Sequence, residues 1–313
     1  MSRRGFTLVE LLVVAGIFAS LFGLLLAIGR PNQASAVRRA AQSIASVLLS
    51  AQSRSLGNPA GGGVILDPAG AANAVTSISA ADVQPFITGL CTIGMPPSIL
   101  NSTSASVTIS PNNASSSDLA DGYKIQFGNP GRESPWMSFT SGNTVTFRAA
   151  GGQTLHNTIW PRPATGGAGL NVLIARYPNE GETLFNLPPT VAIDLSLSGV
   201  GDGTAFDATW SDLSGKNAIG LTFDSVGGVD AVMQGIGATA SAMHPLSPFY
   251  LFVAPLAVVG TGSALASDRA MWVVVHPQTG RVTVSSNVAT IGTGSTALRD
   301  ARAKARAQAA IGK

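Results

Sequence analysis

One carboxylate stands inside the most apolar stretch of the chain. Between Phe6 and Gly29 the only ionisable side chain is Glu10. A charged side chain near the middle of a bilayer-spanning helix costs about 2.5–3.5 kcal/mol, and somewhat less near the helix end. A carboxylate kept at that cost is a candidate functional group, and its available chemistry is pairing with a cation.

The apolar run around this carboxylate is long enough to cross a membrane. Its 24 residues would form a helix of about 36 Å, against a hydrocarbon core of about 30 Å. Ala19, Gly23 and Ala27 recur every four residues, a spacing that lets two helices approach closely. The sequence therefore predicts a transmembrane helix over residues 6–30.

The residues before and within this run carry a specific resemblance. Arg3-Arg4-Gly5, then Phe6-Thr7-Leu8-Val9-Glu10, then an unbroken apolar helix, resembles the N-terminus of type IV pilins and pseudopilins. The resemblance implies that residues 1–5 are a leader, that a prepilin peptidase cuts after Gly5, and that the new terminal residue, Phe6, is N-methylated.

The same resemblance gives Glu10 a role in assembly. Cleavage would create an ammonium on Phe6, one helical turn away and at the positive end of the helix dipole. Glu10 would neutralise its own terminus before assembly and pair with the Phe6 amine of a neighbouring subunit afterwards. An unpaired charge is expensive where the dielectric constant is low, so this pair would favour one axial register.

The resemblance also implies location and partners. The chain would be a single-pass inner-membrane protein with its N-terminus in the cytoplasm and its globular domain in the periplasm or outside the cell. Charge alone leaves the orientation open, because Arg30, Arg38 and Arg39 lie just beyond the other end of the span. The implied partners are other pilin or pseudopilin subunits, the prepilin peptidase, an inner-membrane assembly platform and membrane lipid.

An export signal is the alternative interpretation of the N-terminus. Residues 2–8 come close to a twin-arginine signal, and Ala34-Ser35-Ala36 offers a cleavage site after Ala36. The product would be a soluble periplasmic β-domain protein. Against this stand an apolar run longer than the usual 7–15 residues, the glutamate within it, and Pro31 after it.

A second helical segment follows Pro31. One apolar residue falls on the same face every three or four positions, which predicts an amphipathic stem helix over residues 31–56. The face consists of Val37, Ala41, Ile44, Leu48 and Ala51. Gly57-Asn58-Pro59 would end the helix. We expect the stem face to pack against the domain that follows.

Strand patterns dominate residues 57–296. Short β-branched or aromatic runs bounded by turn residues predict strands at Tyr123–Phe127, Thr144–Arg148, Leu170–Arg176, Thr190–Leu197, Ile219–Phe223, Phe249–Val259, Met271–His276 and Arg281–Ser285. The polar segment 101–118 is predicted to be a loop. The fold class is therefore α+β: a long N-terminal transmembrane and stem helix followed by a β-rich, sandwich-like domain.

Three segments of the body resemble the GspH/FimT-type minor pseudopilins. Ala51–Leu66 would lead from the stem helix into the first strand, and Leu221–Gly228 and His276–Val284 look like two strand turns of that subgroup. The implied function is structural, as a minor subunit of a type II secretion pseudopilus or a type IV pilus, in protein secretion or pilus assembly.

The body shows no pattern of catalytic or cofactor-binding residues. The three histidines, His156, His244 and His276, are scattered, and Cys91 is the single cysteine, which excludes an intrachain disulfide and a multi-cysteine metal site. Asp202, Asp207 and Asp212 lie in a glycine-rich segment, but their spacing matches no calcium-binding loop, which favours a solvated turn. We expect no enzyme activity, no cofactor and no metal.

Charge is concentrated at the two ends of the chain. Residues 55–296 hold 8 basic and 14 acidic residues, a net charge of −6, whereas the tail at 297–313 holds five basic residues against Asp300. This alanine-rich tail is predicted to be a helix without an apolar face that frays in solvent. A solubilising role is favoured; the alternative is DNA binding through Arg299, Arg302, Lys304 and Arg306.

Overall fold

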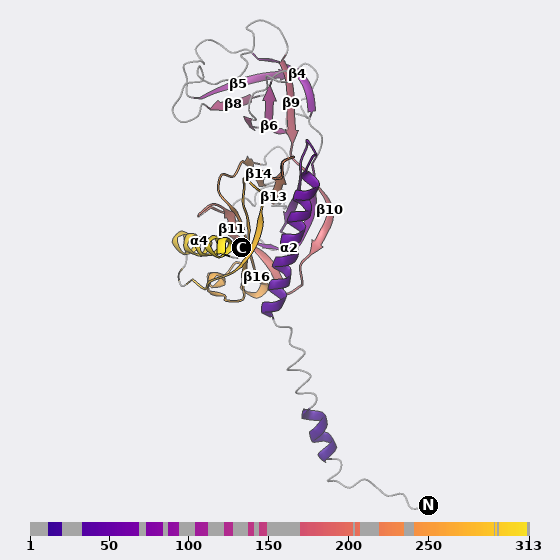
Figure 1. The fold of residues 1–313 in the computed structure, drawn as a ribbon, viewed down its shortest axis with the longest axis vertical. Helices are drawn as coiled ribbons and strands as arrows, with labels where there is room; N and C mark the ends of the chain where they lie inside the picture. The colour runs from indigo at the N-terminus through magenta and orange to yellow at the C-terminus, as the bar shows by residue number, and fades with distance from the viewer. Residues whose placement is uncertain are drawn as a thin grey trace, which may run out of the picture.

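The computed structural model describes residues 12–20, 33–68, 73–83, 87–93, 104–111, 122–127, 137–140, 144–148, 170–202, 204–206, 219–234, 241–290, 292 and 294–311. Beyond residue 32, the described residues form a body, made of one long helix, two antiparallel sheets and a C-terminal helix, and a separate six-stranded barrel (Figure 1).

Helix α2 (Gln33–Ser55) is the predicted stem helix. The residues of the predicted apolar face are all buried to 1% exposure or less: Val37, Ala41, Ile44, Leu48 and Ala51. The helix ends where the sequence indicates, because Gly57 adopts a positive φ of 76° and donates its N–H to the carbonyl oxygen of Ser225.

Two antiparallel sheets pack around this helix. The strands of the first sheet, in the order β10-β3-β1-β13-β14-β15, are Asn179–Asn186, Ser77–Asp82, Gly62–Asp67, Ile219–Phe223, Val229–Gln234 and Ser241–Met243. Those of the second, in the order β12-β11-β16-β17-β18, are Thr204–Ala205, Val191–Val200, Phe249–Pro255, Met271–Val275 and Val282–Ser286, and β2 (Ala74–Val75) pairs with β11. This arrangement confirms the α+β class.

The central strands of the second sheet are buried on both faces. Along β16, Phe249, Leu251 and Val253 point into the core shared with α2, whereas Tyr250 and Phe252 point to the opposite face. Two 3₁₀ turns, Leu256–Val258 and Ala264–Ala266, follow β16, and the second contributes to the opposite face. Such burial on both sides explains why these strands are continuous apolar runs.

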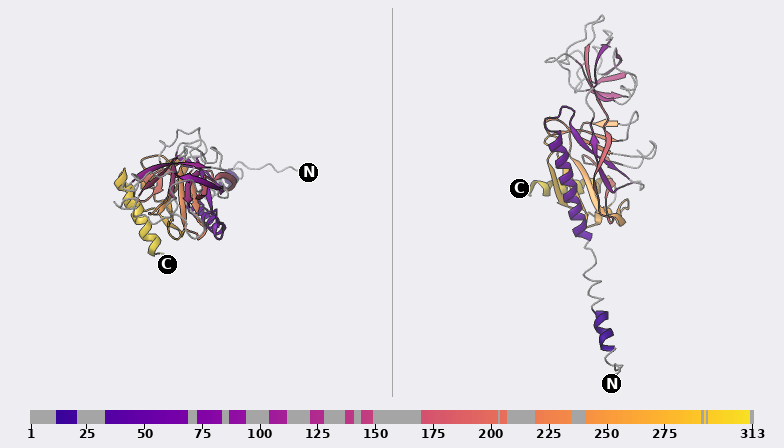
Figure 2. Two further views of the ribbon diagram at one scale, coloured as in Figure 1. Left: turned by 90° about the horizontal axis from the view of Figure 1, so that it is seen from above. Right: turned by 90° about the vertical axis from the view of Figure 1, so that its right-hand side faces the viewer.

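A helix covers that opposite face. Helix α4 (Ser295–Ile311) packs Ala297, Leu298, Ala301 and Ala305 against Trp272 and its neighbours. The left view of Figure 2 places α4 at the outer edge of the body, on the side away from α2. The prediction of a helix without an apolar face was wrong. Alanine at 297, 301 and 305, with leucine at 298, forms a narrow apolar stripe that packs against the second sheet.

Six strands between β3 and β10 close into a barrel, in the order β4-β5-β8-β7-β6-β9. They are β4 (Ile87–Ile93), β5 (Ser104–Pro111), β6 (Gly122–Phe127), β7 (Met137–Thr140), β8 (Thr144–Arg148) and β9 (Leu170–Arg176). The predicted loop at 101–118 was wrong over β5. Its alternating Ser, Val, Thr and Ile residues satisfy their backbone groups by pairing with β4 and β8.

Each predicted strand corresponds to one in the structure, within a few residues at either end. The pattern missed others whose residues are polar or small, such as β10, NEGETLFN. Such a strand is held by its pairing with β3 rather than by an alternating apolar face.

Two adjacent leucines of α2 test the importance of its buried face. Leu48 is fully buried, whereas Leu49 is 46% exposed. We expect Leu48→Ala to lower the free energy of unfolding by about 2–5 kcal/mol, because the cavity lies in the core shared by both sheets. Leu49→Ala should change it by less than about 1 kcal/mol. Denaturant unfolding of the full chain in detergent measures both, and equal losses would contradict this assignment of the core.

Candidate functional site: the junction of α2 with two hairpin turns

The last turns of α2 are joined to both sheets by one side chain. The Gln52 amide nitrogen donates to the carbonyl oxygen of Gly227 at 2.8 Å and to that of Thr279 at 2.9 Å. Gly227 lies in the turn between β13 and β14 of the first sheet, and Thr279 in the turn between β17 and β18 of the second. Gln52 therefore bridges two hairpins that are about fifty residues apart in the chain.

Asp224 shapes the first of these turns. Its Oδ1 atom accepts hydrogen bonds from the backbone N–H of Val226 at 3.0 Å and of Gly228 at 2.8 Å. The backbone N–H of Val229 then donates to the carbonyl oxygen of Pro277 at 2.7 Å, which joins the first turn directly to the second. A short acidic side chain that bonds the following N–H groups is the usual device for fixing such a turn.

The second turn requires glycine at position 280. Gly280 has a φ of +59°, and a Cβ atom there would overlap the Gly227 carbonyl oxygen and the Gln52 side chain. The two turns and the glutamine thus fit together only with hydrogen at this position.

The junction brings together two segments that the sequence had singled out. Leu221–Gly228 contains the first turn and His276–Val284 the second. Gln52 lies outside the predicted apolar face of the stem helix, and no role was predicted for it. Its position beside Ala51, at the border of that face, was the available signal, and the structure shows it half-buried.

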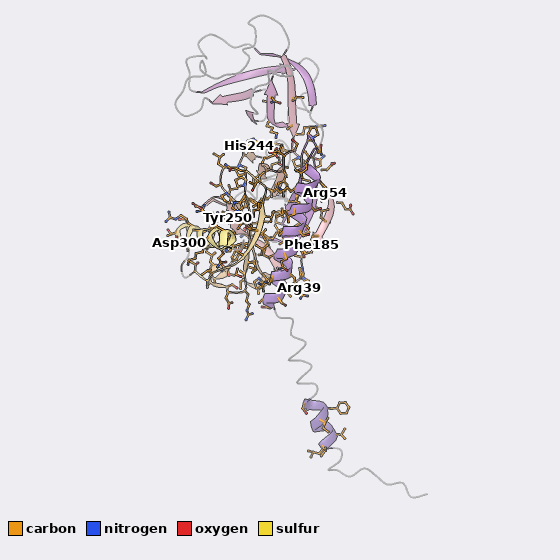
Figure 3. The ribbon with its side chains drawn as sticks, viewed as in Figure 1. Arg39, Arg54, Phe185, His244, Tyr250 and Asp300 are labelled. Atoms are coloured by element: carbon orange, nitrogen blue, oxygen red, sulfur yellow. The ribbon has the colours of Figure 1, made fainter. Side chains whose placement is uncertain are left out.

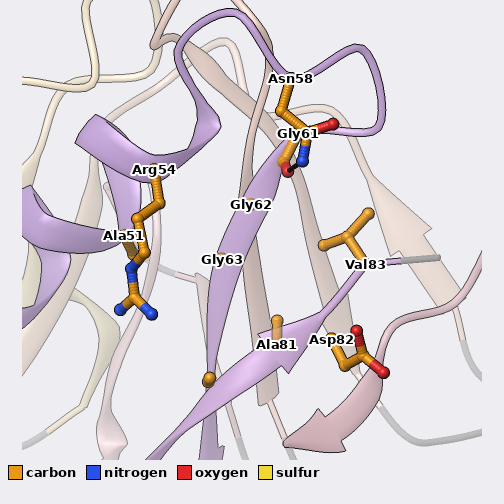
Figure 4. Close-up of a pocket in the computed structure, with 10 residues that line it drawn as sticks. Ala51, Arg54, Asn58, Gly61, Gly62, Gly63, Ala81, Asp82 and Val83 are labelled. Atoms are coloured by element: carbon orange, nitrogen blue, oxygen red, sulfur yellow. Dashed lines mark hydrogen bonds between the residues drawn. The ribbon is translucent and has the colours of Figure 1, made fainter. Parts of the chain in front are cut away.

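A shallow polar pocket lies beside this junction (Figure 4). Arg54 of α2 and Asp82 at the end of β3 lie on opposite sides of it. Asn58 closes the connecting turn by donating to the Gly61 carbonyl oxygen at 2.7 Å. The floor is the start of β1, where a Cβ atom at Gly63 would overlap the Leu221 carbonyl oxygen. The pocket lining offers no nucleophile paired with a base.

Among the described residues one carboxylate, that of Asp194, is fully buried, and it serves the fold. Asp194 is fully buried in β11, where its Oδ1 accepts from the N–H and hydroxyl of Ser196 and its Oδ2 accepts from the N–H of Gly260 at 2.9 Å. Burial raises the pKa of Asp194, and these hydrogen bonds oppose the rise. The carboxylate stabilises the irregular pairing of β11 with β16.

The predicted assembly residues Gly5, Phe6 and Glu10 lie outside the described residues, and so does most of the predicted span at 6–30. Within it, residues 12–20 are helical, and Leu12 and Phe18 are 66% and 62% exposed. The Ser20 hydroxyl donates to the Gly16 carbonyl oxygen in the same helix at 2.6 Å. No helix in the described part of the chain has both the length and the hydropathy needed to cross a membrane.

The alternative cleavage site lies within a packed helix. Ala36 and Val37 are both buried in the first turns of α2. A cut after Ala36 would therefore fall inside α2, beside residues that belong to the core.

The other candidate residues do not gather into a site. His244 is exposed, with its Nδ1 atom against the Asp230 carbonyl oxygen, and His276 follows β17. Burial, together with repulsion from Arg281 and Arg306, lowers the pKa of His276. Cys91 lies in β4.

Of the three aspartates considered for calcium, Asp202 is exposed, and Asp207 and Asp212 lie outside the described residues. The third histidine, His156, also lies outside them. No group of three metal-ligating side chains occurs within the part of the chain that the structure describes.

The tail arginines do not form the uniform basic surface that was considered for DNA. Arg302 is fully buried and donates to the carbonyl oxygens of Gly201 at 2.7 Å and Leu197 at 2.8 Å, with its guanidinium 5.2 Å from the Tyr250 ring centroid. Burial lowers its pKa to about 10. The assignment of Arg302 as a DNA contact was wrong, because this side chain fastens α4 to the body.

The exposed side of helix α4 carries Asp300, labelled in Figure 3, with Arg299, Lys304 and Arg306.

Comparison with known proteins gives one match. Residues 1–26 match the family model described as the prokaryotic N-terminal methylation motif, and this range includes Gly5, Phe6 and Glu10. No curated protein and no solved structure matches the chain significantly.

Two glutamines of α2 test the junction. We expect Gln52→Glu to lower the free energy of unfolding by about 1–3 kcal/mol, because a carboxylate would face two carbonyl oxygens that then lose their donor. Gln42→Glu, on the exposed face of the same helix, should change it by less than about 0.5 kcal/mol. Thermal unfolding of the two variants compares them, and similar stabilities would show that Gln52 does not bridge the turns.

Proposed function

We propose that this chain is a minor subunit of a type II secretion pseudopilus or a type IV pilus, because its residues 1–26 match the N-terminal methylation motif that is typical of type IV pilins and pseudopilins. Members of this family are generally structural rather than enzymatic. The observation that carries the proposal is the motif at residues 1–26, followed within a few residues by an amphipathic helix that is built into the body.

Processing would begin at the leader. The prepilin peptidase cuts after Gly5, and Phe6 becomes the methylated terminus. Glu10 then pairs with the terminal amine of a neighbouring subunit in the filament. The apolar surface of residues 12–20, which the body leaves uncovered, supports packing against lipid before assembly and against other N-terminal helices afterwards.

The path of the chain from membrane to body supports a mechanical role for α2. The span at 6–30 anchors the precursor in the inner membrane, with the body on the extracytoplasmic side. Movement of the N-terminal helix by the assembly platform is transmitted through α2, because its buried face and the Gln52 bridge hold it to both sheets.

The GspH/FimT-like subgroup is the finer assignment within the proposal. Its support is the stem helix leading directly into β1, and the meeting of the two turn segments at Gln52. In this interpretation, the junction is the feature that keeps the stem and both sheets in one rigid unit.

The position of the barrel supports a minor, priming or tip location. It lies beyond the C-terminal end of α2, at the end of the body opposite the start of the helix (Figure 1). In a filament assembled through the N-terminal helices, a later subunit lies on the membrane side of this one. An earlier subunit lies on the far side, beyond the C-terminal end of α2. A subunit stacked directly above would meet the barrel, so a place without such a neighbour fits this shape.

The cleavage site is tested by intact-mass and N-terminal peptide spectrometry of the protein from its native membrane. We expect a mature chain that begins at Phe6 and carries one extra methyl group. Gly5→Ala should largely block this processing, because the peptidase requires glycine before the cut. A chain beginning at Val37, unaffected by Gly5→Ala, would make the protein an exported soluble one.

The assembly role of Glu10 is tested by Glu10→Ala, compared with the substitution Ser20→Ala within the same span. We expect Glu10→Ala to insert into the membrane and be cleaved normally, and to be largely lost from sheared or affinity-purified filaments. Ser20→Ala should be incorporated as the unsubstituted chain is. Incorporation of Glu10→Ala at the normal level would count against a role of this carboxylate in setting the register.

A further inference from the structure

The barrel is inserted at a single point of the body. Strands β3 and β10 pair antiparallel, with Asp82 opposite Asn179, and the whole barrel lies between these two residues in the chain. On the barrel side, the first residue of β4, Ile87, pairs with Ile174 near the end of β9. The chain therefore enters and leaves the barrel side by side, where an ordinary hairpin would have a tight turn.

The strands of the barrel pair only with one another among the described residues. Each of its six strands has two neighbours, and all of those neighbours belong to the barrel. A sheet closed in this way satisfies its backbone hydrogen bonds without a strand from the body. Backbone pairing thus gives the barrel no dependence on the two sheets.

A small apolar contact joins the barrel to the body. Ala175 of β9 packs against Ala231 and Met233 of β14, and Tyr177 packs beside them. Burial raises the pKa of Tyr177 to about 12. The contact involves only these four side chains among the described residues, so the area that it buries between the two parts is small.

A shielded ion pair lies beside that contact. Lys124 of β6 pairs with Asp230 of β14, and the two side chains are 8% and 18% exposed. Within the barrel, Lys124 stands opposite Ala175 in the pairing of β6 with β9, so the ion pair and the apolar contact are neighbours. A charge pair that is largely removed from water tolerates little misalignment, because separating the partners leaves a charge poorly solvated.

We propose that the barrel is a separately folding head, inserted into the β3–β10 hairpin of the pilin-like body and held in one orientation by the Lys124–Asp230 ion pair. The body contains everything that assembly requires: the N-terminal helix, α2 and the two sheets. The head adds a surface beyond the end of α2, and the ion pair decides where that surface points.

The insertion is tested by removing the head from the full-length chain. Residues 83–178 are replaced by Asn-Gly, which suits a two-residue hairpin turn between Asp82 and Asn179, and in a second variant by Gly-Ser-Gly-Ser. We expect at least one variant to unfold cooperatively, to keep the slow hydrogen exchange of β11, β16 and β17, and to be cleaved after Gly5 as before. Loss of exchange protection in both variants would overturn the proposal by showing that the body needs the barrel to fold.

The orientation is tested by hydrogen–deuterium exchange of the full chain in lipid nanodiscs. Asp230→Asn and Lys124→Gln should each speed exchange several-fold in peptides 170–178 and 229–234, and leave β16 and β17 unchanged. The charge-swapped pair Lys124→Asp with Asp230→Lys should recover much of the protection. Asp268→Asn, an exposed carboxylate elsewhere on the body, serves as the control.

The outcomes separate orientation from general stability. If exchange rises as much in β16 and β17 as in peptides 170–178 and 229–234, the ion pair stabilises the whole fold. If exchange is unchanged in both single variants, other contacts hold the head. Either result overturns the proposed role of the ion pair. Neither bears on cleavage after Gly5, so the proposal fails or stands separately from the assignment as a pilin-like subunit.

Discussion

The structure depends on the burial of one face of α2 between two sheets. Five of the nine buried residues of α2 are alanine, so the sheets approach the helix backbone closely. Large apolar side chains from both sheets then fill the space around Ile44 and Leu48. A helix held in this way cannot move without disturbing both sheets. This rigidity is what a subunit handled through its N-terminal helix requires.

Two further devices extend that arrangement outwards. Near the C-terminal end of α2, Gln52 adds hydrogen bonds to the apolar packing. Its amide nitrogen can make both bonds only when both turns are in place. On the far face of the second sheet, α4 covers the aromatic residues of β16 and β17, and buried Arg302 fixes its position. The apolar surface between the two helices is thereby closed to solvent on both sides of that sheet.

The barrel follows a different principle. It closes its own hydrogen bonds and, among the described residues, joins the body through two chain crossings, a small apolar contact and one ion pair. The body is thus built for rigidity, whereas the barrel is attached at one end. Under the proposed function, the body is the part that packs in a filament, and the barrel is the part that presents a surface at its end.

The sequence by itself determined the methylation motif, the stem helix with its buried face, and the strands whose apolar runs are strong. These signals are local: a charge in an apolar run, a period of three to four residues, a run of β-branched residues. Tertiary structure alone decided the roles of Gln52, Lys124 and Arg302. Each is a polar residue whose partner lies about a hundred or more positions away, so no local pattern identifies it. For the same reason, the sequence did not predict β5 and β10, which are strands because they pair with neighbouring strands. It also did not predict the packing of α4, because its alanines form an apolar face only against a sheet that fits them.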